Sequence, residues 1–297
     1  MYELVFDLII ALVVGVVPVW FVLSRKKGWG PLHILVAIAW VVVVYGSFIE
    51  PRFLVVKKYS VDVRPLGAPA STRTLDLVVI SDTHLGKYRH IEWMREVVDK
   101  VNALHPDAVL LAGDLATTIA GVDGFAPLRD LQSRFGAYAV LGNWDYRAGA
   151  VDVRKALGSY GVKTLVNRSV PLEKDGQMFR LIGVDDIQYG KPDWNAALAD
   201  VASGDIPILL VHNPDAVHEA EVHGIPLVIA GHTHGGQIRF PYLGPVPKIP
   251  TKLGNHFDRG AFAVGTVNLF ITPGIGESGP RARFLQPPEI SFLHVIY

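Results

Sequence analysis

Residues 75–84 read Leu-Asp-Leu-Val-Val-Ile-Ser-Asp-Thr-His, a run of mostly apolar side chains that ends in Asp82 and His84. A short apolar run that stops at polar residues predicts a buried β-strand, in this case over 75–81. The next apolar run, 108–113, ends in the same way at Asp114. We therefore expect a buried sheet whose strand ends carry the functional groups.

Six further apolar runs follow this pattern, and helical stretches separate most of them. The additional strands are predicted at 137–142, 179–184, 206–211, 226–230, 269–272 and 290–296. The helices are predicted at 91–104, 125–135, 151–160, 194–201 and 214–223. This alternation favours an α/β fold with a layered sheet, in which active residues gather at the carboxyl ends of the strands.

Oxygen and nitrogen ligands stand at five of the predicted strand ends. They are Asp82 and His84, Asp114, Asn143 and Asp145, His212, and His232 and His234. Asp, Asn and His are the side chains that hold hard or borderline divalent metals. Glycines precede several of them, and a glycine allows a close approach because it has no Cβ. Each fragment alone is a weak signal, but five of them together indicate a metal site.

In chain order these fragments read Asp-x-His, Gly-Asp, Gly-Asn-x-Asp, His and Gly-His-x-His. The set resembles the calcineurin-like metallophosphoesterase superfamily from Leu75 to the C-terminus. The sequence Gly-His-Thr-His-Gly-Gly-Gln-Ile at 231–238, together with the segment 274–290, resembles the membrane-associated bacterial branch. The resemblance implies a metallophosphoesterase fold, a layered β-sandwich flanked by helices, and an enzyme that hydrolyses phosphoric esters or diphosphates.

The resemblance also implies two divalent metal ions (manganese, iron or zinc) and a role for each ligand. One ion would be held by Asp82, His84 and His234. Asp114 would bridge to the second ion, whose site would be completed by Asn143, His212 and His232. Two ions ~3.5–4 Å apart can share one hydroxide and hold phosphate oxygens during in-line displacement. The residues expected to act in catalysis are Asp114, Asn143, Trp144 and Asp145.

The chain departs from the family pattern at Trp144, where the family has Gly-Asn-His-Asp and this sequence has Gly-Asn-Trp-Asp. The missing histidine would help to protonate the leaving oxygen, and an indole cannot transfer a proton. We expect slow hydrolysis of esters with alkoxide-like leaving groups, and a smaller reduction of the hydrolysis rate for a diphosphate bond. The alternative is that Trp144 only packs and that activity is weak. Asp145 is expected to orient a neighbouring group.

Two other segments have more than one interpretation. Asp185 and Asp186 could pass for a carboxylate pair, but no partner ligand stands at that strand end, which favours a solvated turn. The segment 240–250 is apolar and rich in proline, and is not expected to form a strand or a helix. It is either a ligand or membrane contact, which could guide an amphiphilic substrate, or a covered surface loop.

The first fifty residues predict a transmembrane hairpin. Residues 4–23 hold a single charged side chain, Asp7, and residues 28–49 hold none. At ~1.5 Å per residue each stretch spans a hydrocarbon core of ~30 Å. We expect a hairpin at 1–50, a linker at 51–74 and a catalytic domain at 75–297, so that a chain beginning near Ser71 would be soluble and keep its metals. A cleaved signal peptide is the less favoured alternative, because Glu3 stands where a signal peptide is basic and no small-x-small cleavage site follows.

Composition narrows the function further. Lys and Arg (28) balance Asp and Glu (28), which disfavours nucleic acid as a partner. The absence of cysteine excludes a thiolate metal site and a cysteine nucleophile. We expect a phosphoesterase or pyrophosphatase in the cell (inner) membrane, crossing it more than once near the N-terminus, that acts on a phosphorylated small molecule or lipid. UDP-2,3-diacylglucosamine is the most concrete substrate that the resemblance suggests.

Two alternatives to this function remain open from the sequence alone. One is a phosphomonoesterase or phosphodiesterase of broad specificity, and the other is a metal-binding scaffold whose catalysis is weak. Basic residues both in the turn at 25–27 and after the second apolar stretch leave the side of the membrane undecided under the positive-inside rule. Neither the metal nor the oligomeric state follows from the sequence.

Overall fold

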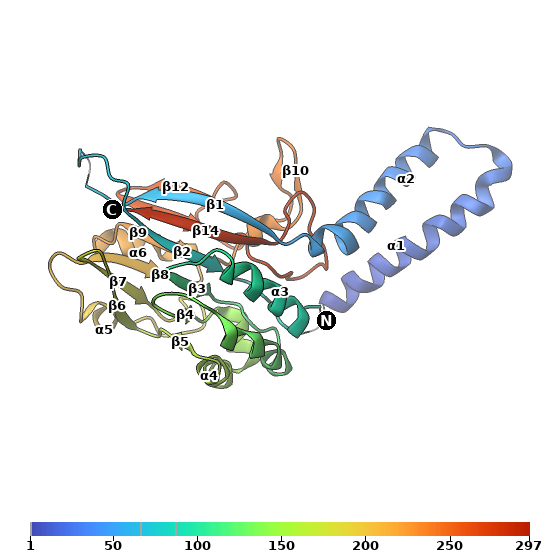
Figure 1. Cartoon of the computed structure of the whole chain (residues 1–297). Helices are drawn as coiled ribbons and strands as arrows, with labels where there is room; N and C mark the ends of the chain where they lie inside the picture. Colours follow the sequence, from blue (N-terminus) through green and yellow to red (C-terminus); the bar gives the residue numbers. More distant parts are fainter. Residues whose placement is uncertain (1, 66, 87) are drawn as a thin grey trace.

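Two six-stranded sheets lie face to face in the computed structural model, with helices on their outer surfaces (Figure 1). The structure describes residues 2–65, 67–86 and 88–297. Met1 of the expected hairpin and Leu66 of the expected linker lie outside these residues. The predicted fold, a layered β-sandwich flanked by helices and preceded by two apolar helices, is confirmed.

Each sheet combines strands from distant parts of the chain. In spatial order, the first sheet consists of β1 (Val55–Asp62), β14 (Glu289–Ile296), β2 (Thr74–Ile80), β3 (Ala108–Ala112), β4 (Ala137–Val140) and β5 (Val162–Thr164). The second consists of β12 (Gly260–Val264), β13 (Val267–Ile271), β9 (Leu227–Ala230), β8 (Ile206–Leu210), β7 (Gln177–Gly183) and β6 (Arg168–Lys174). A separate antiparallel pair is formed by β10 (Arg239–Phe240) and β11 (Gly244–Pro245).

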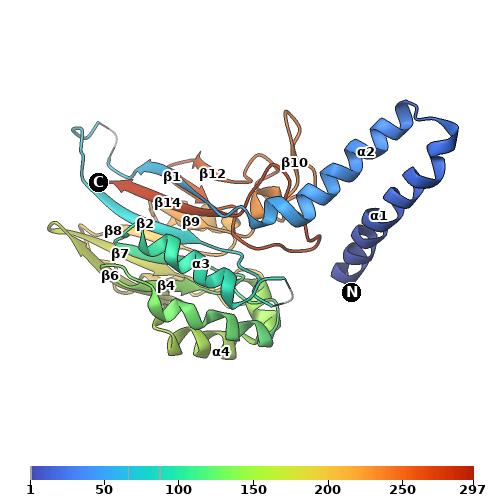
Figure 2. The ribbon, with the colours of Figure 1, turned by 45° about the vertical axis from the view of Figure 1, so that its right-hand side comes forward.

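Helices cover the outer face of each sheet. The first sheet is covered by α3 (Ile91–Asn102), the 3₁₀ helix η4 (Ile119–Asp130) and α4 (Asn143–Ser159), and Figure 2 shows α3 and α4 in this position. The second is covered by α5 (Trp194–Leu198) and α6 (Val217–Val222). Strand β2 shows why this arrangement produces continuous apolar runs. Its Leu77 belongs to the core between the sheets, and its neighbour Val78 belongs to the core under the helices. Both faces are buried, so polar and apolar residues need not alternate.

Two of the predicted helices differ most from the observed ones. The segment 125–135 is not an α-helix, because the chain forms η4 over Ile119–Asp130 and leaves helical geometry after it. Pro127 lies inside η4 and has no amide hydrogen to donate to an α-helical bond. The helix predicted at 151–160 begins earlier, at Asn143, and is kinked at Gly149, where φ is 117°. Asn143 therefore lies in the first turn of α4.

The expected linker at 51–74 contains a strand of the core. Residues 55–62 form β1, which runs parallel to β14 along its whole length, from Val55 opposite Glu289 to Asp62 opposite Ile296. Strands β5, β6 and β12 were also not expected from the sequence. Within 240–250, where no regular structure was expected, β10 and β11 form a short ladder.

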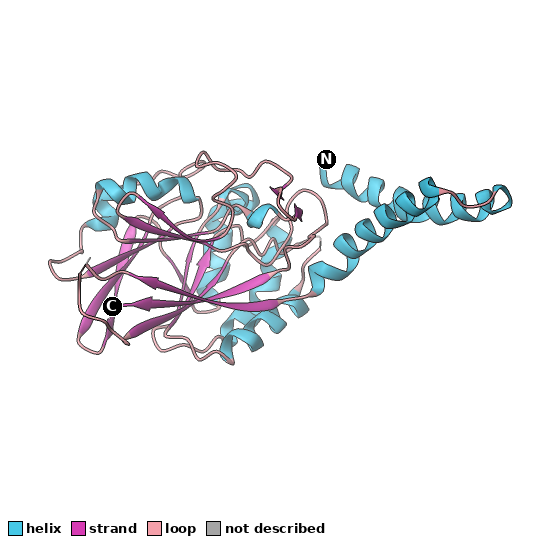
Figure 3. Ribbon diagram, turned by 90° about the horizontal axis from the view of Figure 1, so that it is seen from above, coloured by secondary structure: helices cyan, strands magenta, loops and turns pink. Residues whose placement is uncertain are grey.

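The N-terminal segment forms an antiparallel hairpin that extends away from the sandwich (Figure 3). It consists of α1 (Tyr2–Ser24) and α2 (Pro31–Val44). The indole of Trp40 donates to the carbonyl of Val14 (3.3 Å), and the ring of His33 stacks on Trp20 with 4.6 Å between centroids. Two helices long and apolar enough to cross a membrane occur among the described residues, Leu4–Ser24 and Pro31–Arg52.

The end of the hairpin is built into the domain that the two sheets form. The buried carboxylate of Glu50 accepts hydrogen bonds from the amides of Leu285 (2.8 Å) and Gln286 (2.5 Å). The guanidinium of Arg89 donates to the carbonyl of Pro51. The independence expected for a chain that begins near Ser71 therefore conflicts with the structure, because such a chain lacks both β1 and these contacts.

A chain that begins at Ser71 should be markedly less stable than one that begins at Gly46. The shorter chain loses the buried side chains of Leu54, Val61 and Val63 and exposes the edge of β14. At ~1.5 kcal/mol or more for each side chain, the loss is at least ~4 kcal/mol. Thermal unfolding of the two fragments measures this, and equal melting temperatures would contradict it.

Candidate metal centre

The ligands predicted from the sequence come together where five strands end. Asp82 and His84 follow β2, Asp114 follows β3 and Asn143 follows β4, all in the first sheet. His212 follows β8, and His232 and His234 follow β9, in the second sheet. All seven side chains are buried. The two sheets thus contribute to one polar site at the carboxyl ends of their parallel strands.

One group of three side chains consists of Asp82, His84 and His234. Their ligand atoms lie within 4.8 Å of one another, as a shared metal ion requires. Oδ1 of Asp82 is 3.3 Å from Nε2 of His234, and Nε2 of His84 is 3.2 Å from the same nitrogen. The other carboxylate oxygen of Asp82 accepts hydrogen bonds from the hydroxyl of Ser81 and the amide of His232. These bonds fix the carboxylate so that Oδ1 faces the imidazoles.

A second group of three consists of Asp114, His212 and His232, again with ligand atoms within 4.8 Å. Oδ2 of Asp114 is 3.3 Å from Nε2 of His212 and 3.8 Å from Nε2 of His84 in the first group. Nδ1 of His232 is 3.0 Å from Nε2 of His212. The carboxylate of Asp114 therefore lies between the two groups, which is the position that a bridging ligand needs.

Buried polar atoms without hydrogen-bond partners concentrate at this site. They include Oδ1 of Asp82 and Oδ1 of Asn143. A buried polar atom without a partner costs ~1–3 kcal/mol, and native structures keep few of them. Oxygen and nitrogen donors in this arrangement fit divalent cations of the first transition series.

The backbone at the ligands is strained. Asp82, His84, Asp114, His232 and His234 all have positive φ, between 45° and 73°. This conformation is unfavourable for residues with a side chain, by ~1 kcal/mol or more each, and it persists where the surroundings enforce it. Strain of this kind gathers at functional sites.

Two glycines permit the close approach that the sequence suggested. A Cβ added to Gly113 would lie 2.7 Å from Nδ1 of His212, and one added to Gly142 would lie 2.3 Å from Oδ1 of Asp114. Real Cβ atoms do not come so near to other heavy atoms. Any side chain at these two positions would displace a ligand, so glycine is required at both.

Electrostatics keep most of the imidazoles in the form that binds metal. Burial lowers the pKa of His84 to about 4 and the pKa of His232 to about 3, so both are neutral at pH 7. Burial alone would also lower the pKa of His212, but the charge and hydrogen bond of Asp114 raise it to about 10. Nδ1 of His212 donates to the carbonyl of Ala112 (2.8 Å), which leaves Nε2 facing Asp114. The raised pKa means that His212 carries an additional proton at pH 7. A metal cation between His212 and Asp114 would take the place of this proton.

Asp145 lies outside both groups and holds the ligand loops together. Its carboxylate accepts hydrogen bonds from the amides of Leu115 (2.8 Å), Ala116 (3.0 Å) and Gly142 (2.9 Å). These amides flank Asp114 and Asn143, so the carboxylate ties the loop after β3 to the start of α4. The geometry agrees with the expected orienting role.

Replacing Asp145 by asparagine should weaken metal binding and turnover by ~10–100-fold, the usual effect of losing a group that orients ligands. The amide group of asparagine would place N–H against at least one of the three donors. Metal titration of Asp145→Asn, with Asp152→Asn on the exposed side of α4 as the matched control, measures the effect. Wild-type affinity in both variants would refute the orienting role.

Trp144 stands beside the ligands, between a histidine and an arginine. Its amide donates to Oδ1 of Asp114 (2.7 Å), and its ring meets His84 edge to face, with centroids 5.8 Å apart. The guanidinium of Arg147 lies 4.9 Å from the centre of the indole and donates a hydrogen bond to the hydroxyl of Tyr189 (2.6 Å). Nothing in the sequence pattern singles out Arg147 or Tyr189, which lie far apart along the chain.

The interpretation of Asp185 and Asp186 as a solvated turn was wrong, because both are buried. Asp185 accepts hydrogen bonds from the hydroxyl of Tyr146 and the amide of Lys191. Asp186 accepts from the amide of Tyr189 (2.7 Å). The pair fixes the loop that carries Tyr189, and neither residue belongs to the two groups of ligands.

Arg283 is another residue with a structural role that the sequence analysis did not identify. Its side chain is fully buried and donates to the carbonyls of Pro273 and Gly276. It thereby holds the loop that packs on Asp82, where a Cβ at Gly276 would lie 2.4 Å from the carbonyl of Asp82. The signal in the sequence is the late Gly-Ile-Gly segment at 274–276, which by itself does not indicate a role for the arginine that follows.

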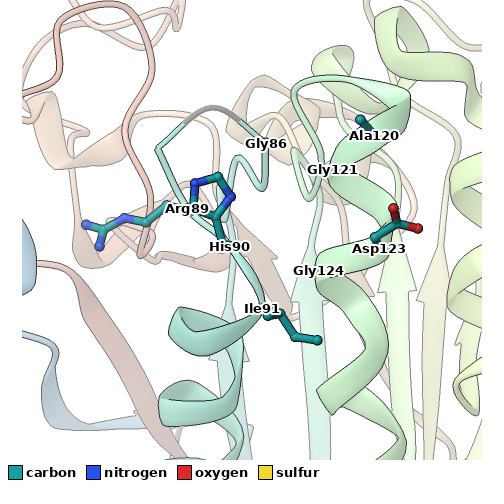
Figure 4. A pocket seen from close by; sticks show the side chains of 8 residues that line it. All are labelled: Gly86, Arg89, His90, Ile91, Ala120, Gly121, Asp123 and Gly124. Atoms are coloured by element: carbon teal, nitrogen blue, oxygen red, sulfur yellow. The ribbon is translucent and has the colours of Figure 1, made fainter.

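One hollow lies away from this site, between the loop before α3 and η4 (Figure 4). It has a volume of about 240 Å³, and its lining includes His90, Ile91 and Asp123 but none of the metal-ligand candidates. The side chain of Arg89 points away from it and pairs with Glu277 (2.9 Å). The ligand groups therefore remain the best candidate for the catalytic centre.

Comparison with known proteins agrees with this geometry. The profile of a family described as calcineurin-like phosphoesterase matches residues 75–236, more than half of the chain. The chain belongs to this family. It is therefore a metal-dependent hydrolase of phosphoric esters, and its two groups of ligand candidates could hold the metal ions that such an enzyme uses.

Several curated relatives extend the similarity. An uncharacterized metallophosphoesterase of Bacillus subtilis, YkuE, is 28% identical over 253 residues, which cover 83% of this chain and 87% of that protein. A second, from Campylobacter jejuni, is 33% identical over 80% of this chain and 62% of its own length. A bovine protein described as a transmembrane protein with metallophosphoesterase domain is 34% identical over 76% of this chain, which spans only 54% of that relative.

Proposed function

We propose that this protein is a membrane-anchored phosphoesterase with two metal ions that cleaves a phosphate ester or diphosphate bond of a lipid or nucleotide–lipid substrate. Asp82, His84 and His234 would hold one ion, and Asn143, His212 and His232 the other, with Asp114 shared between them. The ions would be manganese, iron or zinc, because the donors suit all three. When bound, they supply Lewis-acid activation of water and of phosphoryl oxygens.

The observation that carries the proposal is where the ligand site lies relative to the hairpin. Strand β1 starts directly after the hairpin and runs away from it, and β14 lies parallel to β1. Strand β2 is antiparallel to β14, with Val79 opposite Ser291, so its carboxyl end returns to the end of the sandwich from which the helices leave. The ligands after β2 therefore lie at the same end of the sandwich as the hairpin.

The residues of the chain suit a leaving group that needs little protonation. Trp144 stands in the sequence where the family pattern has a histidine, and its indole cannot transfer a proton. Arg147 stacks on Trp144, and none of the ion pairs among the described residues connects it to a carboxylate. A guanidinium in this position can receive the negative charge of a departing phosphate. This favours a diphosphate such as UDP-2,3-diacylglucosamine over an alkyl ester.

Hydrolysis by the purified full-length protein in nanodiscs tests the proposal. With Mn²⁺, Fe²⁺ or Zn²⁺ supplied separately, a lipid diphosphate should be cleaved faster than lipid monophosphates, soluble monoesters and soluble diesters. Preference for soluble monoesters or diesters would favour the alternative of a broad-specificity phosphoesterase. Binding of two ions without any turnover would favour the metal-binding scaffold.

The membrane assignment has its own test. If both apolar helices span the cell (inner) membrane, the protein should resist extraction by carbonate or high salt and require detergent. Both ends of the hairpin lie at the catalytic domain, so the N-terminus and the active site would share one side of the membrane. Release by salt alone would contradict the anchoring.

A further inference from the structure

The segment that directly follows the metal ligands presents an apolar tip to solvent. In the hairpin formed by β10 and β11, Tyr242 is fully exposed and Leu243 is 78% exposed, and Val246 just after it is 57% exposed. Exposed apolar residues that adjoin one another, unlike isolated ones, indicate a contact surface. We refer to residues 240–246 as the apolar tip.

The apolar tip lies at the end of the domain from which the membrane helices leave. Figures 1 and 2 both place β10 on this side, beside the base of α2. Aromatic rings connect the two: the ring of Phe240 is 5.3 Å from Phe284, which is 6.2 Å from Tyr45. Tyr45 directly follows α2. The apolar tip is therefore connected, through these rings, to the end of the hairpin that lies nearest the sandwich.

Polar contacts mark the level at which the helices meet the domain. The hydroxyl of Tyr88 donates to the carboxylate of Asp7 (2.7 Å), which lies near the start of α1. The guanidinium of Arg281 lies 5.2 Å from the ring of Tyr88 and 5.7 Å from the ring of Phe48. Aromatic and basic side chains of this kind are typical of the interfacial region of a bilayer. A bilayer that held α1 and α2 would have its surface near these residues.

Residues 247–250, which follow the apolar tip, lie next to the candidate metal centre. A cavity of about 260 Å³ has a lining that includes Thr233, His234 and Gln237 together with Lys248, Ile249 and Pro250. His234 is a ligand candidate, so the cavity adjoins the candidate metal centre. Residues 240–250 thus extend from the level of the hairpin base to the catalytic centre.

We infer that the apolar tip enters the interfacial region of the lipid bilayer, and that an amphiphilic substrate reaches the metals along residues 240–250 without leaving the membrane. This deepens the proposed function and rests on its membrane anchoring. Tyrosine and leucine suit the boundary between headgroups and acyl chains. Lys248 supplies a cation for the substrate's phosphate in the cavity beside His234.

The absence of cysteine from the chain makes a direct test possible. The variant Leu243→Cys of the full chain, labelled with an environment-sensitive fluorophore, is placed in phosphatidylcholine–phosphatidylglycerol nanodiscs that contain nitroxide-bearing lipids. Val222→Cys on α6, which is also well exposed (77%), is the matched control, and Leu12→Cys in α1 reports on anchoring. We expect lipid quenching at positions 243 and 12 but not at 222.

The outcomes separate the two proposals. Quenching at position 12, with position 243 no more quenched than 222, overturns the bilayer contact and leaves the anchoring intact. Absence of quenching at position 12 overturns the anchoring itself. In a second measurement, the double variant Tyr242→Ser/Leu243→Ser should lower the ratio of lipid to soluble-substrate turnover about tenfold. Val222→Ser should leave the ratio unchanged, and an unchanged ratio in the double variant would overturn the proposed route.

Discussion

Replacing Asp114 by alanine is expected to remove the binding of both metal ions and to lower hydrolysis by at least ~10³-fold. The carboxylate of Asp114 lies between the two groups of ligands, 3.3 Å from His212 and 3.8 Å from His84. No other carboxylate among the described residues belongs to the group with His212 and His232. Charge stabilisation by metal is worth several kcal/mol, and each 1.36 kcal/mol is a factor of ten in rate.

Metal content after gel filtration, together with turnover on an aryl phosphate, measures this effect. Asp99→Ala, which removes an exposed aspartate from α3, is the matched control and should retain both ions. Asn143→Ala provides a contrast, because it should release the second ion and spare the first. Two ions retained in Asp114→Ala, with activity intact, would refute the bridging role.

The strands that the sequence predicted are those in the interior of the two sheets, and the strands it did not predict are the edges. Strands β1 and β5 border the first sheet, and β12 and β6 border the second. An edge strand has a face or a side open to water and carries charges or proline, as β1 does with Lys57 and Lys58 and β6 does with Pro171. Such segments resemble linkers in their composition, which is why β1 fell within the expected linker.

The candidate site was largely predictable for a related reason. A buried strand that ends in a carboxylate or an imidazole delivers that group to a fixed edge of the sheet, so strand prediction also locates the ligands. The residues that support the ligands cannot be located in the sequence in this way. Arg147 and Trp144 lie close together in the sequence, within α4. Tyr189 and Asp185 come from a distant loop, and only the folded chain shows that they form hydrogen bonds with residues of α4. Burial of Asp185 depends on tertiary packing and not on its neighbours in the sequence.

Replacing Trp144 by histidine should raise turnover on alkyl phosphates far more than on aryl phosphates or diphosphates. An alkoxide needs a proton to depart, whereas a nitrophenolate or a phosphate does not. General-acid assistance is typically worth ~10²–10⁴-fold, so even partial recovery should be measurable. The amide of residue 144 binds Asp114 whatever the side chain, so the substitution should leave the bridging ligand in place.

Steady-state kinetics on the three classes of substrate measure the contrast, and Trp144→Phe is the matched control because it keeps a ring but cannot transfer a proton. The ring at position 144 adjoins His84, so an imidazole there would lie within reach of a phosphate held at the ligands. Equal gains in Trp144→His and Trp144→Phe would mean that the indole acts through shape alone. Loss of activity on a lipid diphosphate in both variants would instead assign the indole, with Arg147 stacked on it, to the substrate pocket. Such a loss would still agree with an enzyme, but it would contradict the idea that the missing proton donor at position 144 limits turnover.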